Sequence, residues 1–526
     1  MNAYSRIDRC RAWPALKAKQ AENLRLALGP ERVSRRLVPA GAGLRYSWAA
    51  MDVDDETVTL LADAANELGL VAQYRELASG AVMNSGERRM VLHHALRGQP
   101  AGAAVKDGRD FRAFYEDQRA RFSAFADAVR SGAIRGSTGK RFTRVVQIGI
   151  GGSDLGPRAL YLALEQWARQ RGELAVRASF ISNVDPDDAN AVLADTDPET
   201  TLFILVSKSG TTQETLANEA LVKSRLGSVP GMDASKHLVA VTSETSPLAG
   251  NPGYLDSFFI DDYIGGRYSA TSAVGGVILS VALGPKTFSA ILEGAADADA
   301  LAMEPDILKN AAMLDALLGV FQRDVLGRPA TAVLPYSQAL SRFPAHLQQL
   351  DMESNGKSVD RSAGRVDIPT GPIVFGEPGT NGQHSFYQLL HQGTDVVPLQ
   401  FIGFEENQTA PDPQFEGSTA RRKLNANLVA QIVAFAKGQD DQDPNRNFPG
   451  GRPSTLLVGK MLDPAALGAL LAHYENKVMF QGFCWNLNSF DQEGVQLGKV
   501  LTKKVLADGG PADPTLAAYA RLLGLS

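Results

Sequence analysis

Between residues 145 and 242, short apolar runs alternate with segments of helical periodicity, and no other feature constrains the fold as much. Strands are expected at Val145–Ile150, Ala178–Ser182, Leu202–Val206 and Leu238–Thr242, and helices between them. Strands that alternate with helices form a parallel sheet covered on both faces. A second, looser alternation runs from Ala330 to Gln481. We therefore expect an α/β fold with two doubly wound α-β-α sandwich domains, mainly parallel sheets, and helical N- and C-terminal extensions.

A chain of 526 residues is too long for a single hydrophobic core. Helical periodicity dominates up to about Asp107, with few strand signals beyond Arg45 to Trp48. We expect a helical N-terminal segment (1–107) that packs on the larger domain. A smaller α/β domain (108–284), the larger α/β domain (285–512) and a helical C-terminal tail (513–526) follow.

The composition excludes several classes of partner. The formal net charge is -5, and no long run of Lys and Arg is present, so neither nucleic acid nor an anionic membrane surface is an expected partner. No segment reaches the roughly 18 uncharged apolar residues that a membrane span needs. Only Cys10 and Cys484 are present, which is typical of a reducing compartment. We expect a cytoplasmic protein with a small soluble ligand.

The turn that follows the third expected strand has the composition of an anion site. Ser207, Lys208, Ser209, Gly210, Thr211 and Thr212 follow five large apolar residues. Thr211 and Glu214 match a capping box, which predicts that a helix starts here with unpaired N–H groups facing the turn. An ordinary strand-to-helix connection is the alternative. Lys208 together with Gly210 favours a phosphate site.

Two glycine-containing turns resemble nucleotide-binding motifs, but each lacks a glycine that its motif requires. The run from Gly149 has Asp154 where a dinucleotide fingerprint requires glycine. The run ending Asn355-Gly356-Lys357-Ser358 has Asp351 where a P-loop requires glycine. Because the first turn and the Ser207–Thr212 turn lie at neighbouring strand ends, Ser153 and that turn could bind one phosphate together.

Four further side chains could carry chemistry, and each has an ordinary explanation. Arg267 follows two glycines, as in a surface turn, and Glu353 lies in a polar loop where an acid is usually solvated. His384 starts an expected helix, and a metal site is disfavoured because His391 supplies only a second ligand. Lys499 lies near the end of the chain on an expected helix, where a lone lysine is usually solvated.

Taken together, these stretches resemble the glucose-6-phosphate isomerase family over most of the chain and in the same order. Asp262–Ser269 fits that family's first signature throughout. Met352–Lys357 and Gly379–His384 also have the residues that are typical of the family. Gly482–Lys499 fits the second signature, except that Cys484 replaces an aliphatic residue and Gln496 replaces a glutamate. Arg89–His93 resembles the family's N-terminal helical segment.

The resemblance implies reversible isomerisation of glucose 6-phosphate and fructose 6-phosphate through a cis-enediolate, in glycolysis and gluconeogenesis. It implies that Glu353 moves the proton, that Arg267 stabilises the enediolate, and that His384 and Lys499 open the sugar ring. The residues it implies for substrate binding are Gly152, Ser153, Ser207, Lys208, Ser209, Gly210, Thr211 and Thr212 for the phosphate, with Gln349 and Gln492 for the sugar. It also implies a homodimer with shared active sites, and neither a metal nor a cofactor.

Two other functions fit part of this pattern. A sugar-phosphate-binding regulator on the same fold needs the Ser/Thr turn but not Glu353, His384 and Lys499. An isomerase for another phosphorylated hexose, such as mannose 6-phosphate, needs all of them. A coupled assay with both sugar phosphates separates the alternatives.

Overall fold

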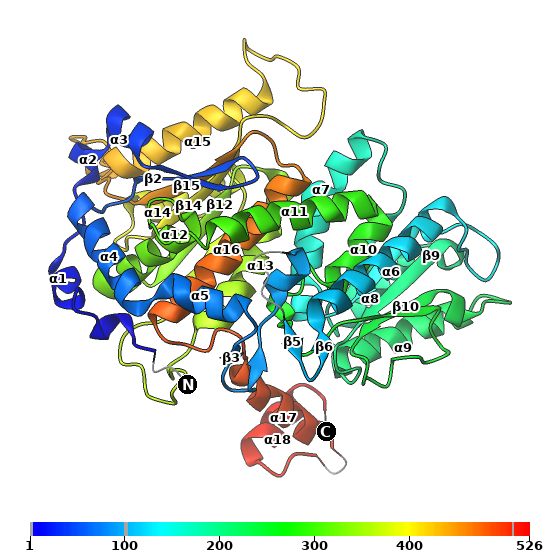
Figure 1. Ribbon diagram of the computed structural model, residues 1–526. Helices are drawn as coiled ribbons and strands as arrows, with labels where there is room; N and C mark the ends of the chain where they lie inside the picture. Colours follow the sequence, from blue (N-terminus) through cyan, green and yellow to red (C-terminus); the bar gives the residue numbers. More distant parts are fainter. Residues whose placement is uncertain (1–3, 99–103, 508–509, 526) are drawn as a thin grey trace. The chain divides into compact units, whose positions relative to one another are not determined.

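The computed structural model describes residues 4–98, 104–507 and 510–525. Within these residues, a five-stranded and a six-stranded sheet are accompanied by two short two-stranded ribbons, and helices pack around both large sheets (Figure 1). The expected α/β fold with mainly parallel sheets is confirmed. The chain divides into two compact units, Met1–Ser489 and Phe490–Ser526, and both large sheets belong to the first.

The five-stranded sheet is parallel throughout, and its order is β11-β10-β9-β7-β8. Its strands are β7 (Arg144–Ile148), β8 (Arg177–Ile181), β9 (Thr201–Val206), β10 (Leu238–Thr242) and β11 (Asp256–Phe259). Every residue of β9 is buried. Helices α8 (Pro186–Ala194) and α9 (Gln213–Gly227) supply Leu193 and Leu226 to the core on one face. Helix α7 (Leu155–Gln170) packs on α10 (Ala273–Leu283), which also contacts β7 and β8.

The six-stranded sheet includes two strands from the N-terminal segment, which the sequence predicted to be mainly helical with a strand signal at Arg45 to Trp48. Its order is β1-β2-β15-β14-β12-β13. The strands β12 (Ala330–Pro335), β13 (Ile373–Gly376), β14 (Leu399–Phe404) and β15 (Ser454–Gly459) are parallel, whereas β1 (Leu37–Gly41) and β2 (Leu44–Ala50) form a hairpin antiparallel to β15. The strand signal at Arg45 to Trp48 lies within β2, whereas β1 and the pairing of β2 with β15, near the other end of the chain, were not predicted.

Helices α4 (Asp55–Leu68) and α5 (Leu70–Ala78) follow the hairpin in the N-terminal segment. Helix α16 (Pro464–Cys484) is buried along almost all of its length and packs on α11 (Pro285–Leu301) and α12 (Ala311–Val320). Two glycines allow the backbones of α11 and α16 to approach closely. A Cβ on Gly468 would lie 1.8 Å from the Ile291 carbonyl oxygen, and one on Gly294 would lie 1.9 Å from that of Ala465.

A buried cluster of charged side chains joins three helices of the first unit. Arg97, in the short helix η2 (His93–Arg97), donates to both carboxylate oxygens of Asp299 in α11 and to Glu475 in α16. All three side chains are fully buried. Burial raises the pKa of Glu475 to about 7, and the Arg97 charge opposes that rise. Because a buried charge without its partner is costly, this cluster specifies how η2, α11 and α16 meet.

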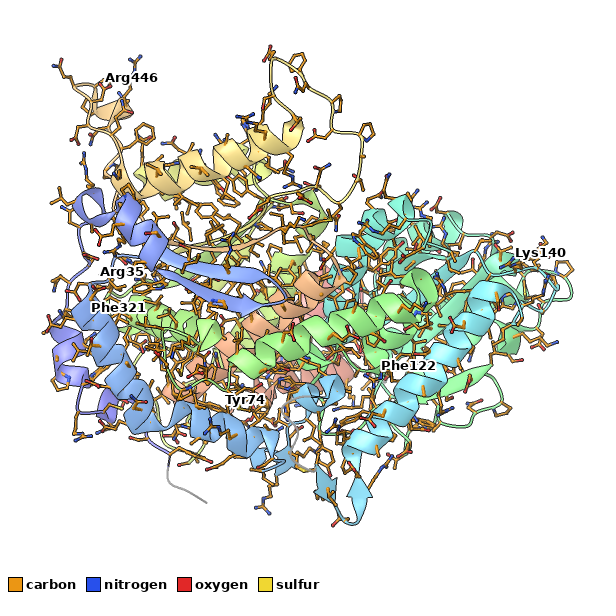
Figure 2. The ribbon with its side chains drawn as sticks, turned by 45° about the horizontal axis from the view of Figure 1, so that its top comes forward. Arg35, Tyr74, Phe122, Lys140, Phe321 and Arg446 are labelled. Atoms are coloured by element: carbon orange, nitrogen blue, oxygen red, sulfur yellow. The ribbon has the colours of Figure 1, made fainter. Side chains whose placement is uncertain are left out.

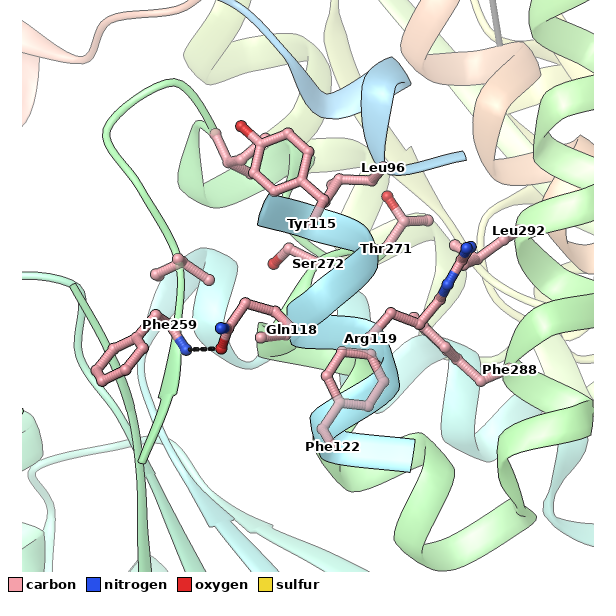
Figure 3. A pocket seen from close by; sticks show the side chains of 13 residues that line it. Leu96, Tyr115, Gln118, Arg119, Phe122, Phe259, Thr271, Ser272, Phe288 and Leu292 are labelled. Carbon is pink, nitrogen blue, oxygen red and sulfur yellow. Dashed lines mark hydrogen bonds between the residues drawn. The ribbon is translucent and has the colours of Figure 1, made fainter. Parts of the chain in front are cut away.

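Helix α6 (Phe111–Ser131) carries Phe122, which packs against Gly276 of α10 (Figure 2). A cavity of about 20 Å³ lies between α6, the end of β11 and the start of α10 (Figure 3). Gln118 accepts a hydrogen bond from the Phe259 backbone N–H beside it (2.9 Å). The cavity has room for about one water molecule and is too small for a sugar phosphate.

The second unit contains α17 (Gln496–Val505) and α18 (Pro514–Leu522), which contact each other. It starts at Phe490, whereas the boundary expected from the sequence lies after residue 512. The boundaries expected after residues 107 and 284 stay predictions. Among the helices of the described residues, none is both long and apolar enough to cross a bilayer.

Candidate active site

The strand order of the five-stranded sheet identifies the edge where a ligand should bind. Strand β8 lies on one side of β7, and β9 lies on the other side. The order in which strands are added to the sheet therefore reverses between β7 and β9. In open α/β sheets, ligands bind outside the carboxyl ends of the strands at such a switch point. The turns that follow β7 and β9 are Gly149–Ser153 and Ser207–Thr212. The structure therefore brings the two predicted phosphate-binding turns to one edge.

The Ser207–Thr212 turn is ordered by its own hydroxyl groups. The Ser207 hydroxyl donates to Thr212 Oγ1 (3.1 Å) and accepts from the Gly210 N–H (3.1 Å). Gly210 has φ of +66°, and a Cβ there would lie 2.2 Å from Ser246 Oγ. The predicted capping box was wrong: α9 begins at Gln213 with Thr212 as its N-cap, which makes no side-chain capping bond. Thr211 instead donates its N–H (3.2 Å) and its hydroxyl (3.0 Å) to Ser209 Oγ.

Lys208 connects this turn to the segment that carries Arg267. Its ammonium group donates to the Ile264 carbonyl (3.3 Å) and lies 3.9 Å from the Asp262 carboxylate. Burial lowers the pKa of Lys208, and the charge of Asp262 partly offsets that effect. Lys208 therefore holds the Asp262–Ser269 signature against the strand edge.

The glycines after β7 bring two further predicted residues into the same place. A Cβ on Gly152 would lie 2.1 Å from the Gly266 carbonyl carbon, and one on Gly151 would lie 3.2 Å from Gln349 Nε2. Ser153 is half-buried, and its hydroxyl makes no hydrogen bond with any described residue. That hydroxyl is therefore available to a ligand at the helix N-terminus of α7.

Arg267 is buried in the short helix η6 (Gly266–Tyr268), and its surroundings fix its direction. Its Nε donates to Ser354 Oγ (2.7 Å) and its Nη2 to the Ser489 carbonyl (2.6 Å). Its Nη1 lies 3.7 Å from Glu353 Oε2. That distance is an ion pair without a direct hydrogen bond, so the carboxylate remains able to accept a proton.

Glu353 does not lie in a polar loop, as the sequence suggested, but ends a π-helical turn, η9 (Gln349–Glu353). π-Helical turns are frequent at functional sites. Lys357 donates to the carbonyls of Glu353 (3.1 Å) and Ser354 (2.7 Å), which fixes the end of the turn. The Glu353 side chain keeps 22% exposure, whereas Asp351 in the same turn is buried. Burial raises the pKa of Asp351 to about 6.

Of the predicted residues, one lies in the first unit without a hydrogen bond or ion pair to the described residues of this cluster, and two belong to the second unit. His384 ends the short helix η10 (Asn381–His384), is exposed, and makes no hydrogen bond or ion pair with a described residue. Gln492 and Lys499 belong to the second unit, where Lys499 lies on α17 as the sequence predicted. The sequence argument overlooked Ser354, Tyr268 and Ser489, which surround Arg267. In the sequence, the only feature that could have indicated them is that Ser354 follows Glu353 and Tyr268 follows Arg267.

The sequence model for phosphoglucose isomerase matches residues 46–513. The chain belongs to the phosphoglucose isomerase family. Among curated members, glucose-6-phosphate isomerase of Treponema pallidum (strain Nichols) is 57% identical and that of Treponema denticola 56%, each over 99% of both chains. The structure of this chain is similar to the crystal structure of a glucose-6-phosphate isomerase from Chlamydia trachomatis, with a TM-score of 0.90 and 42% sequence identity. That similarity covers 99% of this chain and 100% of that one.

Proposed function

We propose that the protein interconverts glucose 6-phosphate and fructose 6-phosphate, in glycolysis and gluconeogenesis, with Glu353 as the base that moves the proton. The observation that carries this proposal is the separation of 3.7 Å between Glu353 Oε2 and the Nη1 of the buried Arg267. An aldose and its ketose interconvert when one base removes a proton beside the carbonyl and returns it to the neighbouring carbon. Membership of the family supports this reaction.

In this mechanism the substrate phosphate binds between the turns after β7 and β9. The ligands are the hydroxyls of Ser153, Ser209 and Thr211 and the N–H groups at the start of α9, with Gly152 beside Ser153 in the same phosphate site. A helix N-terminus favours an anion because its N–H groups are unpaired and its dipole is positive there. Gln349, held against Gly151, then contacts the sugar hydroxyls.

Arg267 acts when negative charge develops on the two oxygens of the enediolate. A guanidinium that is already fixed stabilises that charge without reorganising during the reaction. Because the charge is absent from bound substrate, Arg267 contributes to turnover more than to affinity.

Ring opening requires an acid and a base near the ring oxygen, and we assign it to His384 helped by Lys499. The exposed position of His384 supports a site completed by the partner subunit's His384, and hence a homodimer with shared active sites. Gln492 precedes α17 and is assigned to the sugar.

We further propose that the enzyme acts in the cytoplasm. Both cysteines, Cys10 and Cys484, are buried free thiols. Free thiols persist where glutathione keeps cysteines reduced.

The test is a coupled assay of fructose 6-phosphate conversion, with mannose 6-phosphate in parallel, on the wild type and Glu353→Gln. The wild type should form glucose 6-phosphate. Glu353→Gln should lower kcat by about 100- to 10,000-fold because the amide cannot accept the proton, and should leave KM similar. The exposed Glu377→Gln is the matched control. Normal turnover by Glu353→Gln contradicts the assignment, and a wild type that converts neither sugar favours a regulator.

A further inference from the structure

The Ser354 hydroxyl touches both the Arg267 guanidinium and a second buried hydroxyl. Ser354 Oγ accepts from Arg267 Nε (2.7 Å) and lies 3.0 Å from the Tyr268 hydroxyl, which also lies 3.4 Å from the Ser489 carbonyl. Ser354 is completely buried. This contact is therefore shielded from bulk solvent in the folded protein.

The neighbours of Ser354 are themselves fixed. The Tyr268 ring stacks on His93 with a centroid distance of 4.6 Å. The Ser489 hydroxyl donates to Asn355 Oδ1 (2.7 Å), and Asn355 Nδ2 donates to the Val478 carbonyl in α16 (2.9 Å). A chain of hydrogen bonds thus extends from α16 to Arg267. Side chains locked in this way hold a site to within fractions of an ångström.

The geometry also shows what this arrangement prevents. An arginine and a carboxylate that are free to move frequently form a bidentate pair at about 2.7–2.9 Å. Here Arg267 Nη1 remains 3.7 Å from Glu353 Oε2 because Nε and Nη2 are held by Ser354 and Ser489. A direct pair would occupy the lone pairs with which Glu353 takes the proton and would turn the guanidinium away from the substrate oxygens.

We propose that Ser354 is a positioning residue for the isomerisation: its hydroxyl, with the Ser489 carbonyl, holds Arg267 apart from Glu353 and directed at the enediolate. This inference rests on the proposed roles of Glu353 and Arg267. It assigns to Ser354 no contact with the substrate. The loss of its hydroxyl therefore acts on kcat through Arg267 and leaves substrate affinity largely intact.

The test is a double-mutant cycle of Ser354→Ala and Arg267→Ala, with kcat and KM measured for fructose 6-phosphate. Ser354→Ala should lower kcat about 10- to 100-fold, the loss expected for a misplacement of about 1 Å, and change KM by less than about threefold. In the Arg267→Ala background the same change should have almost no further effect, because the group that it positions is gone.

Two variants separate positioning from general destabilisation. Ser280→Ala is the matched control, because Ser280 is completely buried in α10 and its hydroxyl makes no hydrogen bond with a described residue. It should keep wild-type kcat. Tyr268→Phe should lower kcat by a smaller factor than Ser354→Ala, since Ser354 keeps its direct bond to Arg267. Circular dichroism establishes that each variant is folded.

The outcomes distinguish this inference from the roles on which it rests. If Arg267→Ala keeps normal kcat, the proposed role of Arg267 fails, and the role of Ser354 fails with it. If Arg267→Ala loses activity while Ser354→Ala multiplies that loss by its full single-variant factor, the role of Arg267 stands and the positioning role of Ser354 is overturned. A change of KM alone in Ser354→Ala also overturns it.

Discussion

At Gly152 the site leaves no room for a side chain. A Cβ would lie 2.1 Å from the backbone carbonyl carbon of Gly266, which cannot move aside as a flexible side chain could. Gly152→Ala should push the β7 turn away from Arg267 and lower kcat/KM by at least about 100-fold, because small displacements at a preorganised site are costly. Gly227→Ala is the control, since a Cβ at the end of α9 meets nothing within 4 Å. Activity near wild type in Gly152→Ala contradicts this packing.

Asp324 should make the stability of the fold depend on pH. Burial raises the pKa of Asp324 to about 7, although the Trp485 indole donates to its Oδ2 (2.7 Å). The folded protein therefore keeps a proton that the unfolded chain releases near pH 4. The free energy of unfolding consequently falls as pH rises from about 4 to about 7, by on the order of 2–4 kcal/mol.

Urea unfolding of the wild type and Asp324→Asn at several pH values measures this effect. Asparagine cannot ionise and keeps an acceptor for Trp485, so the variant should gain stability relative to the wild type as pH rises towards 8. Other groups that titrate contribute equally to both proteins and cancel in the difference. Parallel pH profiles would show that Asp324 does not titrate in this range.

At the scale of the residue, the resemblance to the family indicated candidate side chains but not what holds them. The spacing around Gly265 and Gly266 alone favoured a surface turn, and the structure shows that Arg267 is buried and bound to Ser354. Serine next to glutamate is a common pair, so nothing in the local pattern distinguished Ser354. Such contacts depend on side chains from separate elements meeting in three dimensions, which one-dimensional periodicity does not encode.

At the scale of the element, the four predicted strands of the small sheet were confirmed, and the inner strands β9 and β10 are buried at every position. The strands β11 and β13 were missed because each is only four residues long. The start of α9 was misplaced by the capping box, since Thr211 uses its hydrogen bonds on Ser209 instead. Local hydrogen bonding in the Ser207–Thr212 turn thus departed from the ordinary rule for helix starts.

Thr211→Ala tests this reading of the α9 terminus. Because Thr211 is not the N-cap, the variant should change the free energy of unfolding by less than about 0.5 kcal/mol. Asp463→Ala, which removes a side-chain cap on the Ala466 N–H of α16 (2.8 Å), should cost about 1 kcal/mol. If Thr211 binds the phosphate, KM for fructose 6-phosphate should nonetheless rise several-fold. A large loss of stability with unchanged KM would restore the capping role.

At the scale of the whole molecule, shared active sites predict that two inactive variants restore each other. Glu353→Gln and His384→Ala should each be nearly inactive. In a mixed dimer, one site carries both changes and the other carries neither, so refolding the two variants together should recover about a quarter of wild-type activity. Each variant refolded alone is the control. No recovery, with mixed dimers present, would place both residues of one site on the same chain.

The hairpin β1–β2 has a consequence for how the protein is made. Tyr46 pairs with Leu457, so the six-stranded sheet cannot be completed until most of the chain has been synthesised. The small sheet, from Arg144 to Phe259, is contiguous and can form while synthesis continues. The N-terminal hairpin must therefore wait, with β2 as an unpaired strand edge, through most of translation. This interval, rather than the finished fold, is where the nascent chain is most exposed to aggregation and to chaperone binding.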